Sequence, residues 1–132
     1  VRGRLMRLLL DTQIFLWYLD RTARIPGIVR QAIDDTDNAV LVSAAVIWEI
    51  SIKTSRGRLE IPTADLRRLT RLIEATGFEE LPVLARHAAG VHGLPWHHRD
   101  PFDRLMIAQA RDESLTLVTV DPAIRAYDVS VL

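Results

Sequence analysis

The feature that most constrains the fold is an alternation of short apolar runs with segments of helical spacing. Strands are predicted over Leu8–Leu10, Ala39–Val42, Phe78–Val83 and Leu115–Val120, with a short final strand over Val129–Leu132. The first, second and fourth of these runs are apolar and are bounded by polar residues. Strands that alternate with helices along a chain predict an α/β domain with a mostly parallel central sheet.

The predicted helices are placed by their start and stop residues. An amphipathic segment over Ile14–Leu19 follows the first strand, and a second helix begins at Pro26 and runs through Ile33. Ser43 can cap a third helix that ends near Gly57, whereas Thr63 precedes a fourth helix that Gly77 terminates. A short helix fits Leu84–Val91, and Asp100-Pro101 begins a long helix that runs through Ala110.

Length and composition limit the organisation of the chain. Its 132 residues suit one domain, which we expect over residues 6–132, with residues 1–5 as an N-terminal extension. The absence of cysteine excludes disulfides and thiolate metal sites. The longest apolar stretch, Ala39–Trp48, is about half of what spans a bilayer, and the apolar run near the N-terminus is too brief for a secretory signal. We therefore expect a cytoplasmic protein with no membrane contact.

Charge balance bears on the class of partner. The 17 basic residues equal the 17 acidic ones, so the net charge is zero. A neutral total argues against a broad electrostatic clamp for nucleic acid, because such a clamp neutralises many phosphates at once.

Three acids occupy positions at which parallel sheets commonly bind ligands. Asp11 and Asp121 each follow a predicted strand, and Asp103 lies in the first turn of a predicted helix. The carboxyl ends of parallel strands form the edge where ligands bind, so these acids can meet there. Each also has a structural explanation, because aspartate caps helices and is favoured in their first turn. Asp100, directly before Pro101, is interpreted as the helix cap.

Glu49 is a fourth candidate because its helical neighbours are mainly apolar. Residues three and four positions away include Ala45, Val46 and Ile52, so the carboxylate is expected to be partly buried. A buried charge needs compensation. Lys53, at the i+4 position, could supply an ion pair, and a bound metal shared with the other acids is the alternative.

Clustered carboxylates repel one another unless a cation lies between them. Oxygen ligands favour hard ions such as Mg²⁺ or Mn²⁺. Such an ion can polarise a phosphoryl oxygen or generate hydroxide from bound water, which would let a hydrolase work without a nucleophilic serine or cysteine.

Four motifs resemble those of PIN domains, particularly the VapC-type toxins of bacterial toxin–antitoxin pairs. They are LLLDTQIFLWYLD, VSAAVIWEISIK, HRDPFDRLMIAQA and LVTVDPAI, and together they cover the chain from Met6 in the expected order. The resemblance implies Mg²⁺- or Mn²⁺-dependent cleavage of RNA. It assigns both catalysis and metal binding to four acids: Asp11, Glu49, Asp103 and Asp121. It also implies a small VapB-like antitoxin that blocks the active site, and a homodimer.

Other residues of these motifs receive supporting roles. Thr12, Ser43 and Thr119 could hold metal-bound water or support the acids. Arg104 could contact phosphate or form a salt bridge with a neighbouring acid. Gln13 stands where related sequences often have histidine, which could alter hydrogen bonding or substrate choice.

Histidine and tryptophan residues are less specific signals. The four histidines, at positions 87, 92, 97 and 98, fit no single helical face, so a zinc site is not favoured. His98 is expected to order the loop that leads to Asp103. Trp17, Trp48 and Trp96 are interpreted as core or groove residues. The segment Ile14–Leu19 and the helix after Pro26 could form a groove for a partner.

Two other functions remain open at this point. A phosphatase could use Asp11 as a nucleophile, although residue 13 is glutamine and the Asp-x-Asp pattern of such enzymes is absent. A non-catalytic RNA-binding module with a PIN fold is the other alternative. Its expected feature is the loss of one or more acids, and all four are present here.

Overall fold

A four-stranded parallel sheet forms the centre of the computed structural model, which describes residues 6–59 and 66–132. The strands are β1 (Arg7–Leu10), β2 (Ala39–Ser43), β3 (Glu79–Leu81) and β4 (Thr116–Val118). Their order across the sheet is β3-β2-β1-β4, so the first and last strands of the chain are neighbours. The predicted α/β class with a parallel sheet is confirmed.

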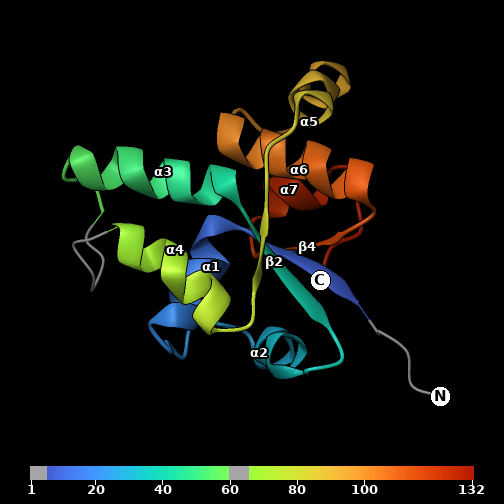
Figure 1. The fold of residues 1–132 in the computed structure, drawn as a ribbon. Helices are drawn as coiled ribbons and strands as arrows, with labels where there is room; N and C mark the ends of the chain where they lie inside the picture. Colours follow the sequence, from blue (N-terminus) through green and yellow to red (C-terminus); the bar gives the residue numbers. More distant parts are fainter. Residues whose placement is uncertain (1–5, 60–65) are drawn as a thin grey trace.

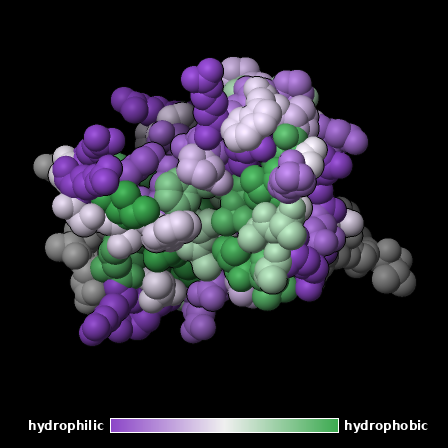
Figure 2. All heavy atoms as spheres, turned by 90° about the horizontal axis from the view of Figure 1, so that it is seen from above, coloured by the Kyte–Doolittle hydropathy of each residue, from purple (hydrophilic) through white to green (hydrophobic). Residues whose placement is uncertain are grey.

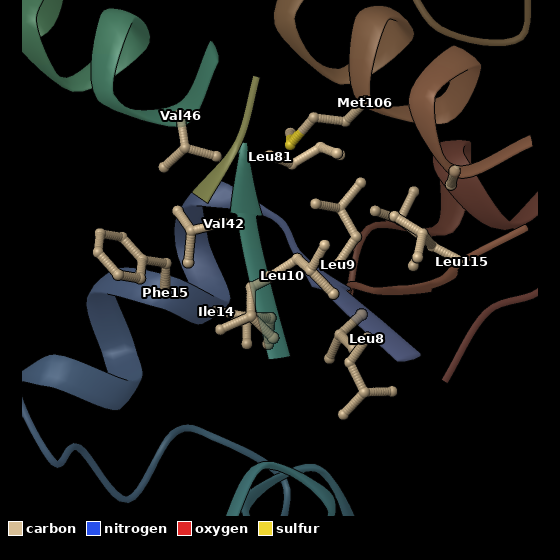
Figure 3. Close-up of a cluster of buried hydrophobic side chains, with 14 of the residues drawn as sticks. Leu8, Leu9, Leu10, Ile14, Phe15, Val42, Val46, Leu81, Met106 and Leu115 are labelled. Atoms are coloured by element: carbon tan, nitrogen blue, oxygen red, sulfur yellow. The ribbon is translucent and has the colours of Figure 1, made fainter. Parts of the chain in front are cut away.

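The central strand β1 is apolar because it is covered on both faces. Leu8, Leu9 and Leu10 are fully buried, although successive residues of a strand point to opposite faces. Leu9 pairs with Leu41 of β2 on one side and with Leu117 of β4 on the other. Figure 3 shows these side chains among the buried residues that helices contribute, including Ile14, Phe15 and Met106.

Helices cover the sheet on both sides. The described helices are α1 (Thr12–Leu19), α2 (Gly27–Asp34), α3 (Ala44–Ser55), α4 (Leu66–Ala75), α5 (Ala85–Gly90), α6 (Pro101–Glu113) and α7 (Pro122–Arg125), with a 3-10 turn η1 (Val91–Gly93). In Figure 1, α5, α6 and α7 lie together above the strands, whereas α1, α2 and α4 lie below or beside them. The helix α3 contacts α1, α4 and α6, and so it joins the two groups.

The predicted helix boundaries follow from side chains that cap them. Ser43 Oγ accepts a hydrogen bond from Ala45 N at 3.0 Å, and Asp100 Oδ1 accepts one from Asp103 N at 3.0 Å. Both residues were predicted as caps, and both predictions are confirmed. Gly77 adopts a positive φ of 83° just beyond α4, as expected for a terminating glycine. The predicted start of that helix at Thr63 lies outside the described residues.

The C-terminal strands are shorter than the sequence indicates. The run Leu115–Val120 contributes only Thr116–Val118 to the sheet, and Phe78–Val83 contributes only Glu79–Leu81. The predicted strand over Val129–Leu132 is reduced to a single parallel bridge between Leu117 and Val131. The cause is the short helix α7, which begins at Asp121-Pro122 and turns the chain away from the sheet edge.

Of the three tryptophans predicted to be core or groove residues, two are exposed and therefore do not belong to the core. Trp48 and Trp96 are 59% and 76% exposed, whereas Trp17 is half-buried against the core. Figure 2, which views the molecule from above Figure 1, shows apolar surface across the middle of the face with hydrophilic side chains around it.

Within residues 6–59 and 66–132, no helix has both the length and the apolar character needed to cross a bilayer.

Candidate active site

Asp11 lies where β1 ends and α1 begins. Its backbone N donates to Val118 O of β4, and its Oδ1 accepts from Ile14 N at 2.8 Å, so the residue caps α1. The side chain is almost fully buried. Burial raises the pKa of Asp11 to about 6, against the opposing hydrogen bonds from Thr119 and Ile14, and the charges of Asp121 and Glu49 raise it further. Asp11 is therefore both a helix cap and a buried acid beside other acids.

Glu49 is buried in α3 and both of its oxygens are hydrogen-bonded. Thr12 Oγ1 donates to Oε1 at 2.6 Å, and Lys53 Nζ donates to Oε2 at 2.6 Å. The ion pair with Lys53 that the sequence offered is therefore present. The hydrogen bond to Glu49 raises the pKa of Lys53, and the charges of Asp100 and Asp103 also raise it. Lys53 thus places one positive charge beside three carboxylates.

Asp103 stands in the first turn of α6, one turn after its cap Asp100. Burial raises the pKa of Asp103 to about 7, and the charge of Asp100 is the next largest cause. Asp11 and Glu49 also raise this pKa, whereas a hydrogen bond from His98 lowers it. Asp11, Glu49 and Asp103 are therefore close enough that the neighbouring charges raise the pKa of Asp11 and of Asp103.

Asp121 combines the two roles that the sequence left open. Its Oδ1 accepts from Ala123 N at 2.9 Å, which caps α7, and its backbone N donates to Thr119 Oγ1. Its Oδ2 lies 3.2 Å from His98 Nε2, on the side of the other acids. The cap does not remove the residue from the site, because the second oxygen is directed elsewhere.

His98 is the site residue that the sequence did not identify as a contact of the acids. Its Nε2 lies 2.7 Å from Asp103 Oδ2 as well as 3.2 Å from Asp121 Oδ2. These three side chains offer ligand atoms that lie within 4.8 Å of one another. The motif HRDPFDR gave the signal that His98 belongs near Asp103, but the link to Asp121 depends on a fold contact that spacing does not show.

The supporting residues divide into two groups. Thr12 and Thr119 hydrogen-bond to Glu49 and Asp11, as predicted for small hydroxyl residues beside the acids. Ser43 is fully buried and its hydroxyl caps α3. Gln13 is exposed on α1.

Arg104 differs from both of its predicted roles. Its guanidinium is buried and donates hydrogen bonds to the backbone oxygens of Val91, Leu94, Pro95 and His98 and to the hydroxyl of Tyr127. Neither the phosphate contact nor the salt bridge to an acid fits this arrangement. Arg104 instead holds the loop that precedes α6.

A second group of polar residues lies at the far end of α6. His87 Nδ1 accepts a hydrogen bond from Leu84 N, so its Nε2 carries the proton and donates to Glu113 at 3.0 Å. Arg86 also pairs with Asp112 and Glu113. This group is an ion-pair network that joins α5 to α6, because a protonated Nε2 has no lone pair for a metal.

The chemistry of the first group fits a hard divalent cation. Asp11, Asp103 and Asp121 supply carboxylate oxygens at the carboxyl edge of the sheet, and burial together with neighbouring acids raises the pKa of Asp11 and of Asp103. A cation placed among them would reverse that shift.

Residues 8–130 match the PIN domain family. The chain is also similar to solved structures: VapBC2 from Rickettsia felis bound to a promoter DNA fragment (16% identity, TM-score 0.69, 96% of this chain and 98% of that one), VapBC-1 from nontypeable Haemophilus influenzae (17%, 0.66, 96% and 97%) and FitAcB from Neisseria gonorrhoeae (23%, 0.61, 95% and 96%). At these identities the likeness shows the fold alone. A search of curated proteins gave no match. Because the family match spans nearly the whole chain and includes all four acids, the chain belongs to the PIN domain family.

Proposed function

We propose that the chain is a metal-dependent endoribonuclease that acts as the toxin of a VapBC-type toxin–antitoxin pair. The observation that carries the proposal is the gathering of acids from four separate segments at the carboxyl edge of the sheet, where two of them have raised pKa values. The pKa values of Asp11 and Asp103 are raised by burial and by neighbouring acids, and strongly perturbed pKa values are typical of functional sites. The similar fold of VapBC structures supports the toxin part of the proposal.

The site is organised before any substrate binds. The first turn of α1 orients Asp11, Thr12 and Lys53 orient Glu49, and His98 orients Asp103. Such preorganisation favours a developing charge because the polar groups need not rearrange. We propose that Asp11, Asp103 and Asp121 hold the cation, with Glu49 beside them. A bound Mg²⁺ or Mn²⁺ would polarise the phosphoryl oxygen and acidify the attacking water.

An exposed aromatic pair supports RNA as the substrate. Trp48 and Phe102 are in edge contact, with ring centroids 5.1 Å apart, and each directly precedes an acid of the site in sequence. Single-stranded nucleic acid is commonly bound by stacking of bases on such rings. This feature favours a strand of RNA over a small phosphate ester, the substrate of the alternative phosphatase function.

We propose that the antitoxin, which would block the active site, uses a groove formed by α1, α2 and α4. The groove has a volume of about 790 Å³ between α1, α2 and α4. Its apolar residues are Leu16, Leu19, Leu69 and Leu72, and its charged residues are Asp20, Arg21, Arg30, Asp34 and Arg68. An amphipathic helix with an acidic side matches this surface, because the groove carries three arginines against two aspartates. A homodimer and a cytoplasmic location belong to the same proposal.

The decisive experiment is incubation of the purified chain with single-stranded RNA in Mg²⁺ or Mn²⁺, followed by EDTA. We expect cleavage that EDTA abolishes and that Asp11→Asn and Asp103→Asn each remove. Asp128→Asn, which changes an exposed acid, is the matched control and should cleave normally. Cleavage that survives chelation or both substitutions would contradict the proposal. RNA binding without cleavage would favour the non-catalytic module.

A further inference from the structure

We propose that His98 is a positioning residue that holds Asp103 and Asp121 in one geometry, so that both carboxylates can bind the same cation. The inference rests on the proposed metal-dependent function. In this proposal, His98 keeps Asp121, the fourth acid, within the site. The evidence is the arrangement of hydrogen bonds around its ring and its backbone.

The tautomer of His98 is fixed by its own chain. Arg99 N donates to His98 Nδ1 at 3.1 Å, so Nδ1 is the acceptor of the ring and Nε2 carries the hydrogen. Nε2 then donates to Asp103 Oδ2 at 2.7 Å and faces Asp121 Oδ2 at 3.2 Å. With its hydrogen in place, Nε2 has no lone pair for a metal. His98 therefore acts on the carboxylates and is not itself a ligand.

The backbone of His98 is also fixed. His98 N donates to Tyr127 Oη at 2.9 Å, and the Tyr127 hydroxyl donates to Pro95 O at 2.8 Å. Arg104 Nη1 donates to the same Pro95 oxygen at 2.8 Å, and the Trp96 ring lies 3.8 Å from the guanidinium carbon. Arg104 and Tyr127 are both buried, so the loop has two rigid anchors beneath it.

The two anchors and the two acids come from the same pair of segments. The start of α6 supplies Asp103 and Arg104, and the segment from α7 onward supplies Asp121 and Tyr127. Each segment therefore carries one residue that fixes the loop and one acid that the imidazole contacts. The imidazole thereby links the two acid-bearing segments to each other through a loop that both hold in place.

Asp121 is the acid that most depends on this link. Its Oδ1 accepts a hydrogen bond from Ala123 N, and its Oδ2 lies 3.2 Å from His98 Nε2. Two neighbouring carboxylates repel each other, so without a donor between them the more exposed one is free to turn toward water. Side-chain exposure is 37% for Asp121 and 18% for Asp103. Removal of His98 should therefore displace Asp121 first.

The test is Mn²⁺ affinity of the full chain, measured by electron paramagnetic resonance of the free ion. We expect His98→Ala to weaken Mn²⁺ binding about 10- to 100-fold, as for other groups that orient metal ligands. His98→Gln, which keeps an N–H donor, should recover part of this loss and also carries the test if the alanine variant does not fold. His92→Ala, which changes an exposed histidine of η1, is the matched control and should bind Mn²⁺ like the unaltered chain.

A double-mutant cycle separates positioning from a general effect on folding. If His98 acts through Asp121, the combined loss in His98→Ala/Asp121→Asn should be smaller than the product of the two single losses. The inference would be overturned if the loss of Mn²⁺ affinity in the double variant equalled the product of the two single losses. It would also be overturned if the Mn²⁺ affinity of His98→Ala were within twofold of that of the unaltered chain. Tighter Mn²⁺ binding would also overturn it, because the imidazole would then occupy the place of the cation. No Mn²⁺ binding by the unaltered chain would instead overturn the proposed function, and this inference with it.

Discussion

Replacement of Asp11 by asparagine is expected to stabilise the metal-free protein at neutral and alkaline pH. The carboxylate is nearly fully buried, and its burial raises the pKa from 3.8 to about 6. A group whose pKa is raised by folding holds its proton more tightly in the folded state, so its ionisation opposes folding. Asparagine keeps an oxygen for Ile14 N, and therefore the cap of α1, but carries no charge.

The size of the effect follows from the pKa. Since one pKa unit corresponds to about 1.4 kcal/mol, ionised Asp11 makes the folded chain about 3 kcal/mol less stable at pH 8. At pH 4 the carboxyl is protonated in the folded state and partly protonated in the unfolded state, and the penalty falls to about 0.5 kcal/mol. Asp11→Asn should therefore add up to about 3 kcal/mol to the free energy of unfolding at pH 8 and little at pH 4.

The assay is urea denaturation of both proteins in EDTA from pH 4 to pH 8. Asp11→Ala is the control for the cap, because it removes the charge together with the hydrogen bond to Ile14 N. It should be about 1 kcal/mol less stable than Asp11→Asn at every pH. A gain that is equal at pH 4 and pH 8, or a loss at pH 8, would refute the argument that burial of a charge dominates at this position.

Three further predictions concern the cation, the loop and the aromatic pair. The raised pKa values of Asp11 and Asp103 mean that the metal-free fold loses stability as pH rises from about 4 through 7. Mg²⁺ or Mn²⁺ should therefore raise the melting temperature more at pH 8 than at pH 5.5. An equal rise at both pH values would contradict these pKa values. Arg104→Met should lower the free energy of unfolding by about 3 kcal/mol, because it leaves several buried carbonyls without a donor, and a loss below 1 kcal/mol in urea denaturation would show that water replaces the guanidinium. Trp48→Ala should weaken single-stranded RNA binding about 10-fold in fluorescence anisotropy while Mn²⁺ affinity stays unchanged, whereas a change of oligomeric state with unaltered RNA affinity would assign the exposed ring to a contact between chains.

The sequence was sufficient for features that depend on local order. The apolar run before Asp11 predicts a strand, the residue type predicts a cap, and the parallel sheet follows from the alternation with helices. The same local reasoning predicts the caps Ser43 and Asp100, which the structure confirms. These interactions join residues that lie within three positions of each other, so periodicity and residue type contain the information.

Interactions between distant segments were not predictable in the same way. Arg104 was predicted to contact phosphate or to form a salt bridge with a neighbouring acid, but its partners Pro95 and Tyr127 lie 9 and 23 positions away. His98 reaches Asp121 only because Tyr127, beyond α7, fixes its backbone. The length of the final strand was overestimated, because residue composition does not show how α7 directs the residues that follow it.

The sequence also presented some alternatives that do not exclude each other in the structure. Asp121 was weighed as a cap against a site residue, and Glu49 as an ion pair with Lys53 against a ligand of a shared metal. Each carboxylate has two oxygens, so one can cap α7 while the other faces His98. Glu49 likewise contacts Thr12 with one oxygen and Lys53 with the other.

The pairing of β1 with β4 sets the order of events when the chain is made. Leu8 lies beside Thr116, and Asp11 N donates a hydrogen bond to Val118 O. Asp11 is therefore held in place by β4, which the ribosome adds more than a hundred residues later. A growing chain can form β1, β2 and α3, but it lacks Asp103, Asp121 and the strand that anchors Asp11. The proposed ribonuclease would therefore have no complete active site while it is still attached to its own message.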